Sequence, residues 1–192
     1  MKKTNITGTQ TEKNLMIAFS GESQARNRYT YYASTAKEEG YEQIYYIFKE
    51  TAENEKEHAK MFLKYIKGTP VEVCAKYITK LGTTKENLEA AIEGEHEENT
   101  NLYPTFAQVA EEEGFPEIAE TFKHVTEVEF CHEERFKKLL ENIEENKVFK
   151  KDSEVEWKCL NCGYRPKGKN APKICPSCKH EQAYFELWCQ NY

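Results

Sequence analysis

What the sequence lacks narrows its possible roles. The first fourteen residues, MKKTNITGTQTEKN, lack the apolar stretch of a signal peptide, and no later segment is long and apolar enough to span a bilayer. We therefore expect a soluble, intracellular protein without a membrane partner. An excess of basic residues is also absent, and the net charge of −6 argues against nucleic acid as a partner. No glycine-rich loop follows a strand, so a nucleotide-binding site of the usual kind is not predicted.

Composition and charge predict two domains. The 192 residues are enough for one domain of ordinary size and a small second one, and 10 Phe and 12 Tyr can fill a narrow core. Residues 147–192 carry nine Lys or Arg and five Asp or Glu, a formal +4, which leaves −10 for residues 1–146. We expect a boundary between these two segments, in the stretch ENKVFKKDSEVE.

The first segment is typical of helices, because it is rich in Glu, Lys, Ala and Leu with apolar residues at helical spacing. Glycines in KEEGYEQI and EEEGFPEI mark helix ends, and a long break at 67–84 indicates a crossover. Four helices are predicted, at about 11–38, 41–67, 84–112 and 115–145. The long middle connection favours a mainly α, ferritin-like four-helix bundle over a simple up-down-up-down arrangement.

An internal repeat supports this bundle. The segment EGYEQIYYIFKETAENEKEH (39–58) matches EGFPEIAETFKHVTEVEFCH (113–132) at a constant offset of 74 residues. The first and third helices match more weakly, with Glu22 in SGES opposite Glu95 in EGEH. The bundle is therefore predicted to consist of two copies of one helix pair.

The repeat also duplicates a metal-ligand pattern. A lone Glu-x-x-His match in so charged a chain usually marks a solvated helix face, but here Glu55-x-x-His58 recurs as Glu129-x-x-His132. Apolar neighbours in VEFCH argue against solvation of the second copy. Residues i and i+3 share a helix face, so each pair can offer a carboxylate and an imidazole to one point. One Glu from each remaining helix completes a di-iron or di-manganese pattern with the ligands Glu22, Glu55, His58, Glu95, Glu129 and His132.

Residues near these glutamates leave alternatives open. Glu98 lies three residues after Glu95, and it is either a solvated neighbour or a ligand that competes with His58 as the metal changes oxidation state. Tyr29 and Tyr103 are either core aromatics or hydrogen-bond donors to ligand carboxylates. We expect Cys131 to be a small buried residue near the site.

The second segment contains two Cys-x-x-Cys pairs. In a reducing compartment, this spacing favours metal ligation over disulfides. Four thiolates suit either zinc or iron, and the spacing alone leaves a structural zinc ribbon open. The expected ligands are Cys159, Cys162, Cys175 and Cys178.

Five motifs follow one another along the chain: AFSGESQARNRY (18–29), ETAENEKEHAK (50–60), GEHEEN (94–99), HEERF (132–136) and CGY…APKICPSC (162–178). On these motifs the chain resembles rubrerythrin over almost its whole length. The resemblance implies a rubredoxin-like iron on the four cysteines, although free-standing rubredoxins usually have Gly where this chain has Lys179. It also implies that His58 replaces Glu98 in the reduced state of a di-iron site. The implied ligands of that site are Glu22, Glu55, Glu95, Glu98, Glu129 and His132.

The resemblance further implies a peroxidase that reduces hydrogen peroxide to water in the cytoplasm of an anaerobe or microaerophile. Its electrons are expected to come from NADH through a rubredoxin or a separate NADH:rubredoxin oxidoreductase. We expect four residues to take part in the reaction: Glu98, His58, Tyr29 and Tyr103. Iron oxidation and storage is the alternative, since ferritin-like bundles share these ligands, and a zinc-filled binding module is a third reading.

Charge and distance favour a head-to-tail homodimer. The bundle and the tail have opposite formal charges, −10 and +4. The tail leaves from the end of the fourth helix, roughly 20 Å along the bundle from Glu129 and His132 at about 1.5 Å per residue. Because that distance is long for fast electron transfer, we expect the tail of one chain to serve the bundle of its partner.

Overall fold

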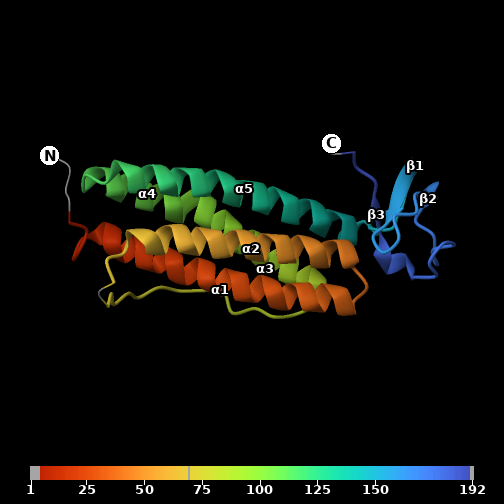
Figure 1. The fold of residues 1–192 in the computed structure, drawn as a ribbon, viewed down its shortest axis with the longest axis horizontal. Helices are drawn as coiled ribbons and strands as arrows, with labels where there is room; N and C mark the ends of the chain where they lie inside the picture. The colour runs from red at the N-terminus through yellow and green to blue at the C-terminus, as the bar shows by residue number, and fades with distance from the viewer. Residues whose placement is uncertain (1–4, 69, 191–192) are drawn as a thin grey trace.

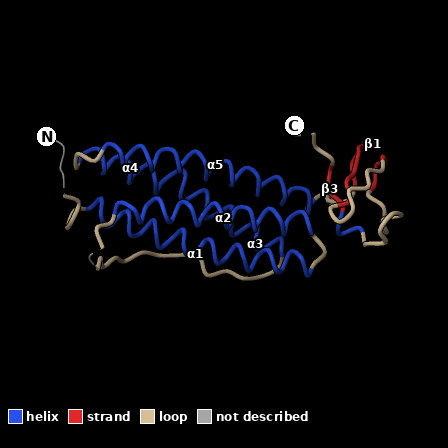
Figure 2. The backbone as a smooth tube through the Cα atoms, in the orientation of Figure 1, coloured by secondary structure: helices blue, strands red, loops and turns tan. Residues whose placement is uncertain are grey.

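The bundle domain of the computed structural model consists of long helices lying side by side (Figures 1 and 2). The structure describes residues 5–68 and 70–190, which leaves out residues 1–4, residue 69 of the crossover and residues 191–192. No helix in these ranges is both long and apolar enough to cross a membrane. The helical elements are α1 (Gln10–Glu38), α2 (Glu42–Tyr65), α3 (Thr84–Glu97), a π-helical turn (Glu98–Leu102), α4 (Tyr103–Glu112) and α5 (Pro116–Glu144).

The internal repeat is visible in the backbone. Gly40 before α2 and Gly114 before α5 both adopt left-handed conformations, with φ of 82° and 85°. Local signals also begin the other helices. Thr9 accepts a hydrogen bond from the backbone N–H of Glu12 at the start of α1, and Thr83 forms a reciprocal capping box at the start of α3.

The third predicted helix, 84–112, is not α-helical throughout. The π-helical turn divides it, and the backbone N–H of Tyr103 donates to the carbonyl of Glu98, five residues earlier. Pro104 follows directly, and a proline inside a helix has no N–H to continue the ordinary ladder. The predicted range 84–112 is therefore helical throughout, as α3, the π-helical turn and α4 in succession, and the proline is the sequence signal for the irregular turn.

Two aromatic clusters divide the bundle core. One contains Tyr29, Phe48 and Phe136, and the other contains Phe62 and Phe122. Along each of the four helical segments, the predicted ligands lie between residues of the first cluster and residues of the second. A buried polar layer is thus enclosed by apolar packing on both sides, which excludes bulk water from it.

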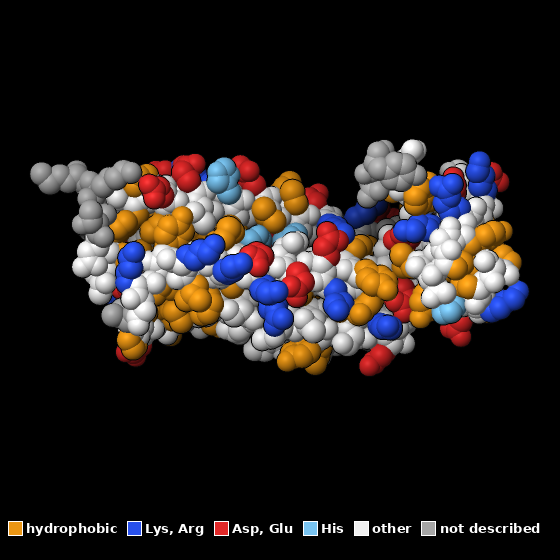
Figure 3. Space-filling view, in the orientation of Figure 1, with side chains coloured by type: hydrophobic (Ala, Val, Ile, Leu, Met, Phe, Trp, Pro, Cys, Tyr) orange, Lys and Arg blue, Asp and Glu red, His pale blue; other side chains and the backbone are white. Residues whose placement is uncertain are grey.

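The small domain is a three-stranded antiparallel sheet with strand order β2-β1-β3. It packs against the turn between α1 and α2, where the rings of Tyr41 and Phe149 stack with centroids 6.3 Å apart. On the face shown in Figure 3, basic side chains gather on this domain and mix with acidic ones on the bundle. Its elements are β1 (Lys150–Cys159), β2 (Lys167–Asn170), a 3-10 turn (Gln182–Tyr184) and β3 (Phe185–Leu187).

Candidate metal centres

Two overlapping groups of donor atoms lie in the polar layer of the bundle. Within each group the donor atoms are all within 4.8 Å of one another, and every residue is buried. Glu55 and Glu129 belong to both groups. The first group is Glu22, Glu55, His58 and Glu129, and the second is Glu55, Glu95, Glu129 and His132.

The two shared carboxylates each face both imidazoles through different oxygens. Oε2 of Glu55 lies 2.9 Å from Nδ1 of His58, and its Oε1 lies 3.2 Å from Nδ1 of His132. The oxygens of Glu129 lie 2.8 Å from the same two nitrogens, one each. Such a carboxylate can bridge two metal ions, one on each oxygen.

The remaining two carboxylates each belong to one group. Oε1 of Glu22 lies 3.9 Å from Nδ1 of His58, and Oε2 of Glu95 lies 3.7 Å from Nδ1 of His132. Since Glu55-x-x-His58 comes from α2 and Glu129-x-x-His132 from α5, the helix period alone places each pair on one face. The whole arrangement has an approximate twofold relation, which is the spatial form of the 74-residue repeat.

Several buried polar atoms in this layer have no hydrogen-bond partner, as expected of atoms whose partner is a metal ion. Buried polar atoms normally have a partner, yet Oε2 of Glu95 makes no hydrogen bond of acceptable geometry. The same holds for Oε1 of Glu55, both oxygens of Glu129 and Nδ1 of His132. These atoms converge at short distances without hydrogen-bonding one another, and a mixed carboxylate and imidazole set suits iron. The residues therefore fit a pair of iron ions.

The charges of the site support the same reading. Burial, followed by the charge of Glu129, raises the pKa of Glu22 well above its usual range. Burial and Glu55 raise the pKa of Glu95 to about 8. Burial lowers the pKa of His58, but Glu129 and Glu55 outweigh this effect and raise it to about 10. Carboxylates outnumber imidazoles here, and two divalent cations would neutralise the excess negative charge.

Two tyrosines hold the terminal carboxylates. The hydroxyl of Tyr29 donates to Oε1 of Glu95 at 2.6 Å, and the hydroxyl of Tyr103 donates to Oε1 of Glu22. Both rings are buried and pack in the aromatic clusters. Each tyrosine is therefore both a core aromatic and a hydrogen-bond donor, the two roles that the sequence left open.

Glu98 lies outside both donor groups, while His58 lies inside one. Glu98 opens the π-helical turn and is partly exposed. Burial and the charge of Glu95 raise its pKa well above the usual range. Its carboxylate lies beside α1, because a Cβ placed on Gly21 would come within 3.8 Å of its Oε1. The structure thus has the imidazole among the donors and the extra carboxylate next to them.

One buried carboxylate beside the site is not among the residues predicted from the sequence. Glu133 is only 2% exposed, and its oxygens contact Lys137 at 2.7 Å, His96 at 3.0 Å and Asn99 at 2.6 Å. Its position directly after His132 is the only hint in the sequence.

One expectation about the motif VEFCH is wrong, and another is confirmed for a different reason than the apolar neighbours. Cys131 is exposed, and so are Val128 and Phe130, at 37% and 54%. The apolar neighbours of His132 therefore point outward from α5, and the burial of Glu129 and His132 comes from the opposite face of the helix.

The four cysteines of the small domain form a second centre. Sγ of Cys159 lies 3.7 Å from Sγ of Cys178, and the same distance separates Cys162 and Cys175. A tetrahedron with metal–sulfur bonds of about 2.3 Å has edges of about 3.8 Å, so the cluster fits one tetrahedral ion. Trp157 and Phe185 are fully buried beside it.

Equivalent backbone turns shape the two cysteine knuckles. The N–H of Gly163 donates to the carbonyl of Cys159 at 2.8 Å, and the N–H of Lys179 donates to that of Cys175 at 2.9 Å. Lys179 takes the left-handed conformation expected of glycine, with φ of 65°, so the turn is kept at a cost of about 1 kcal/mol. The backbone N–H of His180 lowers the pKa of Cys178 to about 6, which favours the thiolate that a metal needs.

Comparison with known proteins covers both domains. A family model described as Rubrerythrin matches residues 13–140, and one described as Rubrerythrin, rubredoxin-like domain, matches residues 157–186. Rubrerythrin-1 of Clostridium acetobutylicum is 56% identical over 193 residues, which cover 98% of this chain and 99% of the relative. Rubrerythrin of Porphyromonas gingivalis is 53% identical over 189 residues, with 98% and 94% covered.

Solved structures agree with these matches. Nigerythrin in a partially reduced state is similar with a TM-score of 0.64 at 29% identity, over 97% of this chain and 90% of that one. A bacterioferritin of Mycobacterium tuberculosis, at 16% identity and a TM-score of 0.64, shares the ferritin-like fold over 76% of this chain and 91% of its own. The bundle has a carboxylate and histidine di-iron site, the small domain has a four-cysteine iron site, and the chain belongs to the rubrerythrin family.

Proposed function

We propose that this protein is an oxidoreductase that reduces hydrogen peroxide to water in the cytoplasm. The reaction breaks the O–O bond, consumes two electrons and two protons, and yields two molecules of water. The observation that carries the proposal is the presence in one chain of two overlapping donor groups and a four-cysteine site. The first can hold the two reducing equivalents that the reaction needs, and the second can pass on single electrons.

The residues of the bundle have separate tasks in this proposal. Iron bound in both donor groups would supply the two electrons for cleavage of the O–O bond. Glu55 and Glu129 hold the two positions close together, while Tyr29 and Tyr103 orient the terminal carboxylates. The aromatic clusters on both sides keep bulk water away from the reacting atoms.

We further propose that Glu98 and His58 alternate as ligands at one position. A trivalent ion prefers a carboxylate to an imidazole, so Glu98 would bind in the oxidised protein and His58 in the reduced one. Both residues lie near Glu22. His58 lies 3.9 Å from Glu22, and Glu98 lies against Gly21, its neighbour in sequence.

The electrons are proposed to come from NADH through a rubredoxin or a separate NADH:rubredoxin oxidoreductase. They would enter at the four-cysteine site of one chain and pass to the di-iron site of its partner in a head-to-tail dimer. Within one chain, the small domain packs on Tyr41, which is fourteen residues from Glu55 along α2. At about 1.5 Å per residue, that separation is roughly 20 Å.

Iron oxidation and storage remains the second candidate, because the ferritin-like bundle is shared with a bacterioferritin. The four-cysteine site argues against it, since storage needs no centre that relays electrons for each turnover. The two functions differ in iron content. A peroxidase should keep about three irons per chain after exposure to ferrous iron and air, whereas a storage protein should accumulate many more.

A direct assay tests the proposal. Protein whose four-cysteine iron is in the ferric state should be red because of thiolate-to-iron charge transfer. It should oxidise one NADH per hydrogen peroxide when rubredoxin and its reductase are supplied. The Glu55→Ala, Glu129→Ala double variant should lose this activity and keep the red colour, because its small domain is unchanged. Failure of the red, fully metallated wild-type protein to consume peroxide would refute the function.

A further inference from the structure

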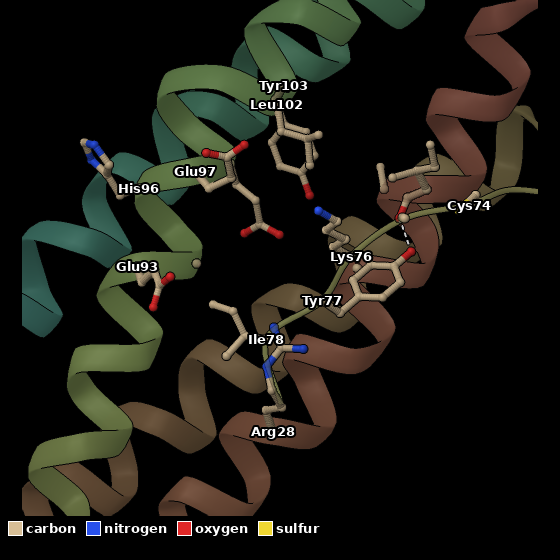
Figure 4. Close-up of a pocket in the computed structure, with 16 residues that line it drawn as sticks. Arg28, Cys74, Lys76, Tyr77, Ile78, Glu93, His96, Glu97, Leu102 and Tyr103 are labelled. Atoms are coloured by element: carbon tan, nitrogen blue, oxygen red, sulfur yellow. Dashed lines mark hydrogen bonds between the residues drawn. The ribbon is translucent and has the colours of Figure 1, made fainter. Parts of the chain in front are cut away.

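A cavity of about 650 Å³ opens beside the di-iron ligands. It lies between α1, the crossover residues 74–78 and the end of α3 with the π-helical turn. Figure 4 shows Arg28 from α1 and Tyr103 from α4 directed into the space, with Ile78 of the crossover beside it. Glu98 and Tyr103 both line the cavity, and the hydroxyl of Tyr103 donates to Glu22, so the cavity ends next to the first donor group.

The cavity is much larger than hydrogen peroxide requires. The two oxygens of that molecule occupy about the volume of two waters, roughly 60 Å³. Pockets that bind organic ligands typically measure about 300–1,000 Å³, and this cavity falls in that range. Its size therefore indicates a ligand with an organic group.

The lining favours an uncharged ligand with an apolar body. The lining contains two basic residues, Arg28 and Lys76, and three acidic ones, Glu93, Glu97 and Glu98, so the cavity as a whole does not favour an anionic ligand. Nη1 of Arg28 is buried without a hydrogen-bond partner and can donate to a polar group of a neutral ligand. The apolar or aromatic side chains among the other lining residues include Ile17, Ala18, Ala75, Tyr77, Ile78 and Leu102. Tyr77 also donates a hydrogen bond to the carbonyl of Ile17 at 3.4 Å, which attaches the crossover to α1 (Figure 4).

We propose that this cavity binds neutral alkyl and aryl hydroperoxides as a second class of substrate, an inference that rests on the proposed peroxidase function. The apolar group would lie against Ile78 and Leu102, with the hydroperoxide end toward Glu98. The O–O bond of ROOH breaks and two O–H bonds form, so that two electrons and two protons give ROH and water. The electrons come from the same external donor that serves hydrogen peroxide reduction.

Cumene hydroperoxide and hydrogen peroxide should be compared as substrates of the metal-loaded protein, with 2-phenyl-2-propanol measured as the product. Ala75 is exposed at the cavity, and Ala75→Trp places an indole in the opening. We expect this variant to lower the ratio of kcat/KM for cumene hydroperoxide to that for hydrogen peroxide at least tenfold. Thr79→Trp, at an exposed position of the same segment outside this cavity, should leave the ratio unchanged.

Binding is measured independently of turnover. In zinc-substituted protein, 2-phenyl-2-propanol should show saturation-transfer signals that Ala75→Trp reduces and Thr79→Trp preserves. Reduction of hydrogen peroxide without reduction of cumene hydroperoxide would overturn the inference and leave the proposed function standing. A protein inactive toward both peroxides would refute the proposed function. Independently of activity, equal NMR signals in the two variants would refute the cavity as the binding site.

Discussion

Asn99 and Glu133 connect the π-helical turn to α5. The side-chain amide of Asn99 donates to Oε2 of Glu133 at 2.6 Å and to the backbone carbonyl of Glu95 at 2.7 Å. Glu133 in turn follows His132 on α5. This contact therefore fixes the backbone between Glu95 and Glu98 relative to the helix that carries the opposite pair of ligands.

Replacing Asn99 with alanine should destabilise the protein and slow turnover. The change removes the amide that donates to Oε2 of Glu133 and to the Glu95 carbonyl, which should lower the free energy of unfolding by about 1–3 kcal/mol. The rate of peroxide turnover should fall by a larger factor than the metal affinity, because the turn that carries Glu98 loses its contact with α5. Denaturant unfolding and peroxide assays of metal-loaded protein measure the two effects.

Asn101 supplies the matched control for this experiment. It lies in the same π-helical turn, but its amide donates to Glu97 at an exposed position. Asn101→Ala should therefore change stability by less than about 0.5 kcal/mol. Equal losses in the two variants would contradict a special role for the Asn99–Glu133 contact.

The convergence of the two Glu-x-x-His pairs could be predicted from sequence because the geometry of each pair is local. Glu55 and His58 share a helix face whatever the helix packs against, and the repeat at Glu129 and His132 distinguishes them from a chance match. The glycine turns at Gly40 and Gly114 were accessible for the same reason. Helix boundaries and the cysteine knuckles also depend on short-range signals.

Features that depend on packing between distant segments could not be predicted. Asn99 and Glu133 are 34 residues apart and follow no common period. The cavity depends on the path of an extended crossover over α1 and α3, for which no hydrophobic pattern exists. The exposure of Cys131 was mispredicted because apolar neighbours were taken as a sign of burial, although single apolar residues are common on protein surfaces.

Removing the hydroxyl of Tyr29 or Tyr103 should weaken metal binding. Each hydroxyl is the buried donor to one terminal carboxylate. Tyr29→Phe and Tyr103→Phe should each reduce metal affinity or peroxide turnover about 10–100-fold. Tyr32→Phe is the control, since that hydroxyl donates to the backbone of Lys80 instead. It should lower stability by about 1 kcal/mol without a change in affinity, and a loss of metal equal to that of Tyr29→Phe would count against the orienting role.

The substitution Glu22→Gln should stabilise the metal-free protein and destabilise the metal-loaded protein. In metal-free protein, Glu22 is buried near other carboxylates, and its pKa is raised by burial and then by Glu129 and Glu55. An acid with a raised pKa destabilises the fold as pH rises above its unfolded value of about 4.5. At pH 7, Gln should therefore raise the free energy of unfolding of metal-free protein by at least about 1 kcal/mol.

Metal-loaded protein should respond in the opposite way, because the substitution removes a charged ligand. Thermal unfolding with and without a chelator measures both cases, and below pH 4.5 the gain in the metal-free protein should disappear. A loss of stability in both forms at pH 7 would show that the glutamates are not in electrostatic excess.

Alternation of Glu98 and His58 predicts a movement of one metal. Crystal structures of reduced and oxidised protein should show that ion displaced by about 1–2 Å, of the order of the 1.5 Å helical rise per residue. Glu98→Ala should retain both metals, because Glu98 lies outside the two donor groups, and should slow peroxide turnover more than it lowers stability. The same ligands in both oxidation states would exclude the alternation.

Electron transfer between subunits is tested by complementation. One variant lacks tail iron (Cys159→Ala, Cys162→Ala), and the other lacks the di-iron site (Glu55→Ala, Glu129→Ala). Each alone should be nearly inactive. After subunit exchange, half of the dimers are mixed and each contains one intact pair of centres, so about a quarter of wild-type activity should return. Transfer within one chain predicts no recovery, because neither chain has both centres.

The control for complementation replaces the tail variant with a chain that carries both sets of substitutions. Its mixed dimers contain no intact pair in either direction, so activity should stay at the level of the parents. The roughly 20 Å between the small domain's contact at Tyr41 and the ligand Glu55 is the physical reason to expect transfer to the partner. Mass spectrometry must first establish that mixed dimers are present. If they are and the first mixture remains inactive, electrons travel within the chain, and the stacking of Tyr41 on Phe149 then becomes part of the route to be tested.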